Sequence, residues 1–363
     1  MSFAPEPPYA HGSPERTVVL LVNLGTPVAP TAAALRRYLA QFLWDPRVVE
    51  IPRLLWWLIL NGVILRLRPA KSAAKYAAIW TDAGSPLLTW TARQATLLQT
   101  TLQARGHNVT VRHAMRYGEP AIDSTLDALK AEGMARLLVL PMYPHYAAAT
   151  TASTIDAVAT WAQHTRRVPE LRVINRYHDD PGYINALAHS VRGHWAANGR
   201  GQKLVMSFHG VPARSLALGD PYHCECHKTA RLLAEALGLG KADYMVTFQS
   251  RLGRAKWLEP YTEPSVQKLA ADGLRNIDAI CPGFAVDNLE TLEEIAMEAK
   301  DAFIKAGGET FNFIACLNDA PDWITALGDI TERHLQGWPT RAVADPAAAT
   351  AQRQRALAMG AAD

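Results

Sequence analysis

The sequence predicts an α/β protein with two four-stranded parallel sheets, each covered by helices on both faces. Three observations support this fold class. Apolar runs rich in β-branched residues alternate with helical patterns along the chain, a rhythm typical of parallel sheets. The eight predicted strands divide into four before about residue 176 and four after it. The first strand of each half also ends in a similar way, which indicates an internal duplication.

The strands are predicted from short apolar runs bounded by turn residues. They are expected at Val18–Asn23, Val109–Ala114, Arg136–Leu140, Leu171–Asn175, Leu204–Phe208, Tyr244–Phe248, Asp278–Cys281 and Thr310–Ile314. The helices are predicted from apolar residues that recur every three to four positions. They include Thr31–Phe42, Glu119–Ala131, Ser153–Gln163, Tyr183–Ala197, Lys228–Leu237, Asn288–Ala306 and Asp322–His334.

The duplicated strand ends predict how the two halves face each other. The first strand runs into Asn23-Leu24-Gly25-Thr26-Pro27, and its counterpart runs into Phe208-His209-Gly210-Val211-Pro212. Ligands of open parallel sheets bind beyond the carboxyl ends of the strands. We therefore expect Leu24 and His209 to face one cleft, one as an apolar surface and the other as a base.

The domain organisation follows from this division. We expect a disordered N-terminus over residues 1–15 and a first domain over 16–176, which carries a hydrophobic lip. A second domain is expected over 177–336, followed by an Ala-rich tail over 337–363 that is mostly disordered, with at most a short terminal helix.

Composition excludes several classes of protein. The formal net charge of +3, without a dense Lys/Arg block, argues against a nucleic-acid surface. Four cysteines in 363 residues fit a reducing compartment, and the polar, Pro-rich first 15 residues contain no secretory pattern, so we expect a cytoplasmic protein. Neither G-x-G-x-x-G after the first strand nor G-x-x-x-x-G-K-[ST] occurs, which disfavours a dinucleotide or nucleoside triphosphate.

One apolar segment stands out. Residues 54–60 read Leu-Leu-Trp-Trp-Leu-Ile-Leu, and Val63-Ile64-Leu65 follows. The run is shorter than the roughly 20 residues that a membrane-spanning helix needs. Two interpretations remain open: a buried helix or lip, and a peripheral membrane contact through Trp56 and Trp57, which would make the protein membrane-associated.

His209 is the first candidate for chemistry. An imidazole at a strand end can act as a base or as a metal ligand near neutral pH. A second candidate is the helix after Cys281-Pro282-Gly283-Phe284, where Glu290, Glu294 and Glu298 recur every four residues and form an acidic ridge. The alternatives are a structural role for His209 and a capping box between Asp287 and Glu290 at the start of the helix.

Three further clusters have weaker signals. Arg116 follows a strand and could clamp a carboxylate or form a surface ion pair. The loop Tyr143-Pro144-His145-Tyr146, followed by small residues, could face a flat apolar ligand or pack between domains. Cys224-Glu225-Cys226-His227 has C-x-C spacing without a second ligand pair, which does not match a zinc site.

Together these segments resemble ferrochelatase, in its Gram-negative bacterial form, from about Val18 to Ile330. The motifs that carry the resemblance are Leu21-Val22-Asn23-Leu24-Gly25-Thr26-Pro27, Gly84-Ser85-Pro86-Leu87, Met115-Arg116-Tyr117, Tyr143-Pro144-His145-Tyr146, Ser207-Phe208-His209-Gly210, Gly219-Asp220-Pro221-Tyr222, Phe248-Gln249-Ser250-Arg251, Cys281-Pro282-Gly283-Phe284 and Asp287-Asn288-Leu289-Glu290-Thr291-Leu292.

The resemblance implies two Rossmann-like domains with a porphyrin cleft between them, and insertion of Fe²⁺ into protoporphyrin IX to form protohaem. It implies that His209 and Glu290 are catalytic and bind iron, and our hypothesis adds Glu294 and Glu298 as a relay to solvent. Substrate contacts are implied for Leu24, Ser85, Arg116, Tyr117, Tyr143 and Trp257. We expect a monomer with iron as a substrate and no resident cofactor.

The sequence departs from the family members that carry a [2Fe–2S] cluster. Ala148 and Leu216 stand where two cluster patterns place a Cys, and no Cys follows Cys316, so we expect no cluster. Two alternative functions stay open: a chelatase for another tetrapyrrole or metal, such as coproporphyrin or cobalt, and a porphyrin or haem carrier without activity. A carrier would not need both His209 and the acidic ridge.

Overall fold

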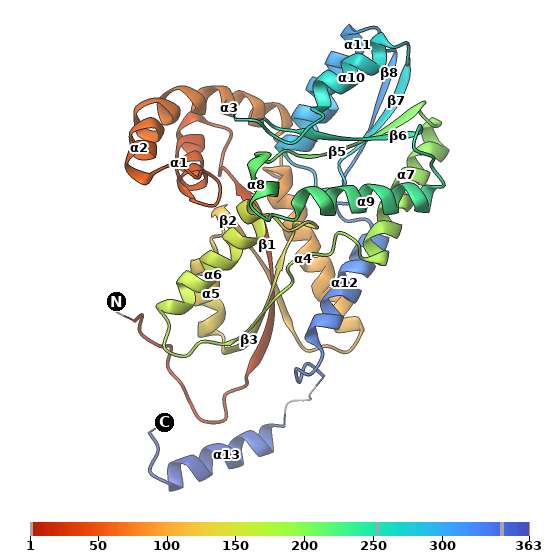
Figure 1. The fold of residues 1–363 in the computed structure, drawn as a ribbon. Helices are drawn as coiled ribbons and strands as arrows, with labels where there is room; N and C mark the ends of the chain where they lie inside the picture. The colour runs from red at the N-terminus through yellow and green to blue at the C-terminus, as the bar shows by residue number, and fades with distance from the viewer. Residues whose placement is uncertain (1–2, 252, 254, 342–344, 363) are drawn as a thin grey trace.

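The structure is a computed structural model that describes residues 3–251, 253, 255–341 and 345–362 (Figure 1). Its eight strands form two four-stranded parallel sheets, which confirms the predicted fold class. The strands are β1 (Arg16–Thr26), β2 (Thr110–Gly118), β3 (Met134–Pro141), β4 (Glu170–Val173), β5 (Lys203–His209), β6 (Tyr244–Gln249), β7 (Asn276–Ile280) and β8 (Thr310–Ile314).

The strand orders are β2-β1-β3-β4 and β6-β5-β7-β8, so the two sheets have the same topology. In each sheet the first strand of its half is an inner strand, and this strand ends at Leu24-Gly25-Thr26 or at His209. The described helices of the first half are α1 (Ala32–Trp44), α2 (Arg53–Ile59), η1 (Leu60–Ile64), α3 (Leu65–Ile79), α4 (Pro86–Ala104), α5 (Ile122–Ala131), η2 (Ala148–Ala152) and α6 (Ser153–Gln163).

The described helices of the second half are α7 (Pro181–Asn198), α8 (Arg214–Ala217), α9 (Tyr222–Leu237), α10 (Thr262–Ala271), η3 (Glu290–Ala299), α11 (Lys300–Lys305), α12 (Pro321–Leu335) and α13 (Pro346–Ala358). Elements η1, η2 and η3 are π-helices, in which backbone hydrogen bonds join residues five apart. The sequence pattern predicted one α-helix over 288–306, and η3 corrects that prediction for residues 290–299.

One hydrophobic cluster runs through both halves of the chain. Alternate residues of β1, such as Val19 and Leu21, share it with Met206 and Phe208 of β5 and with Trp323 of α12. The other faces of the two sheets have their own clusters, one under α5 and α6 and one under α10, η3 and α11. The shared core fixes the two strand ends relative to each other.

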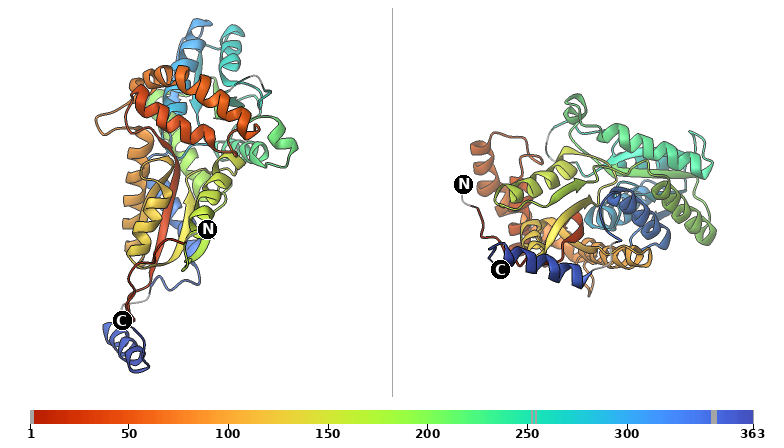
Figure 2. Two further views of the ribbon diagram at one scale, coloured as in Figure 1. Left: turned by 90° about the vertical axis from the view of Figure 1, so that its left-hand side faces the viewer. Right: turned by 90° about the horizontal axis from the view of Figure 1, so that it is seen from below.

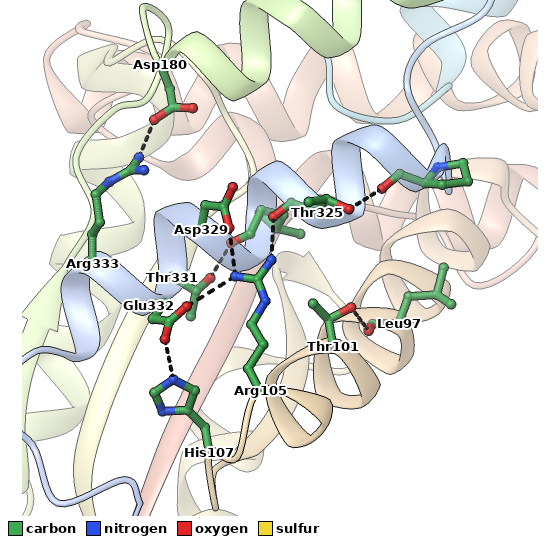
Figure 3. Close-up of polar contacts among 12 residues, drawn as sticks. Leu97, Thr101, Arg105, His107, Asp180, Thr325, Asp329, Thr331, Glu332 and Arg333 are labelled. Atoms are coloured by element: carbon green, nitrogen blue, oxygen red, sulfur yellow. Dashed lines mark hydrogen bonds and ion pairs between the residues drawn. The ribbon is translucent and has the colours of Figure 1, made fainter.

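Helix α12 joins the second half to the first, because it packs on both α7 and α4 (Figure 1). Arg105, which follows α4, pairs with Asp329 at 2.7 Å and with Glu332 at 3.2 Å (Figure 3). The buried His107 ring contacts the second carboxylate oxygen of Glu332 at 2.9 Å. A hollow of about 580 Å³ beside these residues lies near the amino end of β2, away from the carboxyl ends of β1 and β5.

The two terminal segments lie outside the sheets. Residues 3–15, expected to be disordered, form no helix or strand, but Glu6 pairs with Lys130 at 2.7 Å on the first half. The tail, expected to be mostly disordered, contains α13, which has no buried residue and stands apart from the body of the molecule (Figure 2). Asp345 caps this helix by accepting hydrogen bonds from the N–H groups of Ala347 and Ala348.

Candidate active site

His209 is the last residue of β5, where its side chain leaves the sheet half-buried. Its Nδ1 lies 2.6 Å from the carbonyl oxygen of Gly210. A carbonyl can only accept, so Nδ1 carries the proton and the lone pair of the neutral ring is on Nε2. Gly210 leaves no room for a side chain, because a Cβ there would lie 2.7 Å from the Gln249 carbonyl oxygen and 3.2 Å from the Trp257 ring.

The acidic residues of η3 divide into two pairs. Glu294 lies toward His209: Ser250 donates a hydrogen bond to its carboxylate, and Gln249 Nε2 lies 3.4 Å from the same oxygen. The backbone oxygen of Glu290 accepts from Gln249 Nε2 at 2.6 Å. Glu298 instead shares the ammonium of Lys75 with Glu293. Glu298 is thus paired with Lys75 and not with the residues that hold Glu294, and its role as a relay stays a prediction.

Burial and charge shift the pKa values of this group in directions that suit proton transfer. Burial raises the pKa of Glu294, and the charge of Glu290 adds to it, bringing the value to about 7. Burial also raises the pKa of Glu290. Burial lowers the pKa of His209, against the opposing charge of Glu294. Near neutral pH the site therefore combines a neutral imidazole with a carboxyl group that exchanges its proton easily.

The alternative role for Glu290, a capping box with Asp287, is wrong. Asn288 and Thr291 form the reciprocal pair instead: Asn288 Oδ1 accepts from the N–H of Thr291 at 3.1 Å, and Thr291 Oγ1 accepts from the N–H of Asn288 at 3.0 Å. Asp287 accepts from Asn318 Nδ2 and from the N–H of Cys316. The Glu290 side chain is thereby left available for chemistry.

Arg116 and Tyr117 meet at a carboxylate that belongs to the protein itself. Arg116 Nη2 lies 2.6 Å from Asp45 Oδ2, and the Tyr117 hydroxyl donates to the same oxygen at 2.8 Å. Ser153 also donates to it at 2.5 Å. The Asp45 side chain is only 3% exposed, so Arg116 forms neither a surface ion pair nor, in this arrangement, a free clamp for a substrate carboxylate.

The other predicted substrate contacts lie at different depths around the strand ends. Leu24 is half-buried and packs on the same apolar cluster as Leu289, the residue before Glu290. Ser85 is almost fully buried, and its hydroxyl oxygen accepts from Thr26 Oγ1 at 2.8 Å. Tyr143 lies near Tyr117, and burial raises its pKa well above the ordinary value. Trp257 is half-buried, and its backbone forms an isolated antiparallel β-bridge with Pro212 in the loop after His209.

Cys224 and Cys226 do not converge. Cys224 is exposed and Cys226 is buried, since residues two apart on helix α9 lie on different faces. Across the described ranges, no group of three or more His, Cys, Asp and Glu side chains is arranged to hold a metal ion. All four cysteines are described, and none of them is paired.

The sequence did not indicate several residues that the structure places at the site. Asp45 and Ser153 contact Arg116 and Tyr117 from distant positions of the chain and belong to no motif. Ser250 stands in the motif Phe248-Gln249-Ser250-Arg251 and directly follows strand β6, but it was not predicted as a site residue. Its φ of 67° is unusual for a residue other than Gly and turns the hydroxyl toward η3.

Comparison with known proteins gives consistent results. A family model described as "Ferrochelatase" matches residues 16–335. The protein named "Ferrochelatase" from Polaromonas sp. is 64% identical over 99% of this chain and 100% of its own length. "Ferrochelatase" from Methylibium petroleiphilum is 64% identical, with 99% of both chains covered. Among solved structures, SirB from Bacillus subtilis with Fe³⁺ has a TM-score of 0.53 and 12% identity, covering 91% of this chain and 100% of that one, and shares the fold.

Proposed function

The chain belongs to the ferrochelatase family, and we propose that it inserts Fe²⁺ into protoporphyrin IX by means of His209, Glu290 and Glu294. The overall reaction exchanges two porphyrin N–H protons for one divalent metal ion and releases both protons. The site therefore needs an acceptor for each proton and ligands for Fe²⁺ as it loses water. Imidazole nitrogen and carboxylate oxygen are suitable ligands for this ion.

The observation that carries the proposal is the fixed tautomer of His209 together with two half-buried carboxyl groups on η3, Glu290 and Glu294. The Gly210 carbonyl holds the proton on Nδ1, so Nε2 is the base in the neutral ring. The lowered pKa of His209 keeps that ring neutral near pH 7, and the raised pKa of Glu294, about 7, allows it to take up and release a proton. We assign the first proton to His209, and the second to Glu290 and Glu294.

The first half of the chain would supply the opposite wall of the porphyrin site. Leu24 and Leu289, the residue before Glu290, pack against the same apolar cluster, so an apolar wall adjoins the acidic helix. Tyr117, held by its hydrogen bond to the Asp45 carboxylate, and Tyr143 beside it would line this wall. Ser85 and Trp257 support the two strand ends from behind. A rigid cleft of this kind favours a distorted macrocycle over a flat one, which is catalysis by differential binding.

Three properties of the whole protein belong to the same proposal: its oligomeric state, its compartment and its contact with a membrane. Both halves of one chain build the site, so we propose that a monomer is active. All four cysteines are unpaired, which supports a reducing compartment such as the cytoplasm.

No described helix has the length and hydropathy to cross a bilayer. We also propose a peripheral membrane contact through the lip, which we define as α2, η1 and α3. Trp57 would take part in it, whereas Trp56 is buried and donates to the Leu43 carbonyl.

The test is metal insertion by a His209→Ala variant. We expect insertion of Fe²⁺ and Zn²⁺ to fall at least about a hundredfold, because the base and one metal ligand are lost together. Porphyrin binding, followed by tryptophan fluorescence, should remain within about threefold, since the apolar wall is unchanged. The control is His164→Ala, whose exposed ring is hydrogen-bonded to the Thr160 carbonyl of the helix that it follows. Near-normal turnover in His209→Ala would refute the assignment.

The same assay separates the alternative functions. Fe²⁺, Co²⁺ and Zn²⁺ are tested against protoporphyrin and coproporphyrin with the wild-type chain. Preference for coproporphyrin or for Co²⁺ would identify a chelatase of different specificity. Porphyrin binding without insertion of any of these metals would identify a carrier.

A further inference from the structure

Lys75 connects two parts of the chain that would handle different substrates. It lies on α3 in the lip, and its ammonium is 2.8 Å from Glu293 Oε2 and 2.9 Å from Glu298 Oε1 on η3. Glu293 is 9% exposed, whereas Glu298 is 50% exposed. Within the described part of the chain, Lys75 makes both of the ion pairs that join α3 to η3.

The two carboxylates that meet at Lys75 are five residues apart. In an α-helix such residues would be separated by roughly 140° around the axis and would point to different faces. In a π-helix, whose hydrogen bonds join residues five apart, they come to the same side. Residues 290–299 are π-helical, and a single ammonium accordingly reaches both Glu293 and Glu298. The two contacts together are therefore specific to the π-helix.

The same register determines where Glu290 and Glu294 lie. The start of the helix is fixed by the Asn288–Thr291 pair. With the start fixed, a change to α-helical winding would rotate every later residue around the axis, Glu294 included. Glu294 would then leave Ser250 and Gln249, which hold it near His209. Long π-helices are rare, so this one requires tertiary contacts to persist.

Lys75 is itself well anchored. The next residue, Tyr76, is 7% exposed, and its ring packs edge-on against Tyr38 with 6.4 Å between ring centroids. Both rings belong to the apolar cluster that includes Leu24 and Leu289. The backbone of residue 75 is therefore fixed relative to the predicted porphyrin wall, and its side chain spans from that wall to the outer face of the acidic helix.

We propose that Lys75 is a positioning residue, which holds residues 290–299 in the π-helical register that presents Glu290 and Glu294 to His209. The inference rests on the proposed function for its kinetic consequences, but the register itself can be measured without activity. Lys75 contacts neither porphyrin nor iron in this scheme. Its effect is on the placement of the acidic groups, and it should therefore influence kcat rather than the binding of porphyrin.

The experiment compares Lys75→Met and Lys75→Arg with the control Lys300→Met. Lys300 directly follows η3, is exposed and is not in a salt bridge within the described structure, so the control removes the same charge from the same region. We expect Lys75→Met to lower kcat for Zn²⁺ insertion about tenfold, because displacing a reacting group by about 1 Å can cost a hundredfold. KM for protoporphyrin should stay within about twofold. Lys75→Arg should recover most of kcat, and Lys300→Met should behave as wild type.

A second set of variants separates register from stability. Lys75→Met leaves the buried Glu293 carboxylate unpaired, which could impair folding, so Lys75→Met/Glu293→Gln removes that charge as well. It should show the same tenfold loss as Lys75→Met. Hydrogen exchange of the backbone of residues 290–299 should accelerate in both variants, while exchange in α12 remains unchanged.

The outcomes are distinct. Wild-type kcat and wild-type exchange in Lys75→Met/Glu293→Gln would overturn the inference. So would an equal loss in Lys300→Met, or a loss confined to KM for porphyrin. If the wild-type chain inserts no metal, the proposed function fails, and the exchange measurement alone decides whether Lys75 holds the register.

Discussion

At the residue scale, the site depends on what surrounds His209 and Glu294 more than on their identity. Ser250 and Gln249 hold the Glu294 carboxylate, and burial together with the charge of Glu290 raises its pKa to about 7. Gly210 fixes the tautomer of His209. In an exposed pair of the same residue types, the imidazole would stay protonated over a wider pH range than in this site. The carboxylate would already be ionised at pH values well below 6. Burial brings the two groups to the same working range.

A pH dependence follows. Below about pH 7, Glu294 is protonated and can no longer accept a porphyrin proton, so Zn²⁺ insertion by the wild-type chain should fall between pH 8 and pH 6. Glu294→Gln should be slower at pH 8 and should lose most of this decline, because the titrating group is gone. The measurement is kcat at several pH values with saturating porphyrin.

Glu235→Gln is the control for this profile, since Glu235 lies on the surface and pairs with Arg231. It should reproduce the wild-type curve. A Glu294→Gln variant that keeps the full decline between pH 8 and pH 6 would assign the titration to another group.

Sequence reasoning located His209 from its place after an apolar strand, and the glutamates from their spacing. It did not find Asp45, Ser153 or Lys75. These residues contact the predicted ones in space but are separated from them by 36 to 223 positions in the sequence. Such contacts depend on tertiary structure, which local patterns do not encode. Arg116 illustrates the limit: its residue type predicted a carboxylate partner, but not that the partner is Asp45.

At the scale of elements, the eight strands were predictable because each is a short apolar run between turn residues. The π-helix was not. Its buried residues are Thr291, Glu293, Ile295 and Ala299, whereas the apolar residues Leu292 and Ala296 are only partly buried. Ten residues are too few for the apolar pattern to separate α-helical from π-helical winding. The Asn288–Thr291 pair at its start and Lys75 of α3 hold the winding instead.

The end of β1 depends on a glycine. Gly25 has φ of 108°, and a Cβ there would lie 1.7 Å from the Tyr117 carbonyl oxygen of β2. Gly25→Ala must therefore separate β1 from β2 at the site, and we expect it to lower the free energy of unfolding by about 3–5 kcal/mol. Gly84 has a similar φ of 102° with no atom within 4 Å of such a Cβ. Gly84→Ala should cost only about 1–2 kcal/mol, from the backbone strain.

Urea unfolding of the two variants measures this difference. Equal losses would mean that backbone conformation alone, and not the contact with Tyr117, sets the requirement at Gly25. The Gly25→Ala variant should also lose metal insertion at temperatures where it remains folded, because Tyr117 and Leu24 move with the strand end.

At the scale of the whole molecule, the lip combines an apolar surface with positive charge. Leu54, Trp57, Leu58 and Leu67 are each more than half exposed. Residues 51–80 contain five Lys or Arg and no Asp or Glu. Figure 1 shows the lip as the orange helices α2 and α3 at one side of the molecule, beside the strand ends that build the site. A monomeric protein seldom exposes so many large apolar side chains together without a partner.

An anionic bilayer fits this surface, because it offers apolar depth and negative charge together. We therefore expect the wild-type chain to sediment with vesicles of phosphatidylcholine and phosphatidylglycerol, and more weakly with phosphatidylcholine alone. Burying one Leu side chain contributes about 1.5–3 kcal/mol, so Leu54→Ser/Leu58→Ser should weaken vesicle binding at least about tenfold. Metal insertion into a porphyrin dissolved in detergent should be unchanged, since neither side chain reaches the site.

Val168→Ser/Leu171→Ser is the matched control, with two exposed apolar residues before and in β4. They lie near the amino end of a parallel strand, whereas the lip lies near the carboxyl end of β1. If vesicle binding depended only on exposed apolar area, both double variants would lose it alike. Loss confined to the lip variant would mean that the membrane contacts the molecule beside the cleft, where an apolar porphyrin could pass between bilayer and site without crossing water.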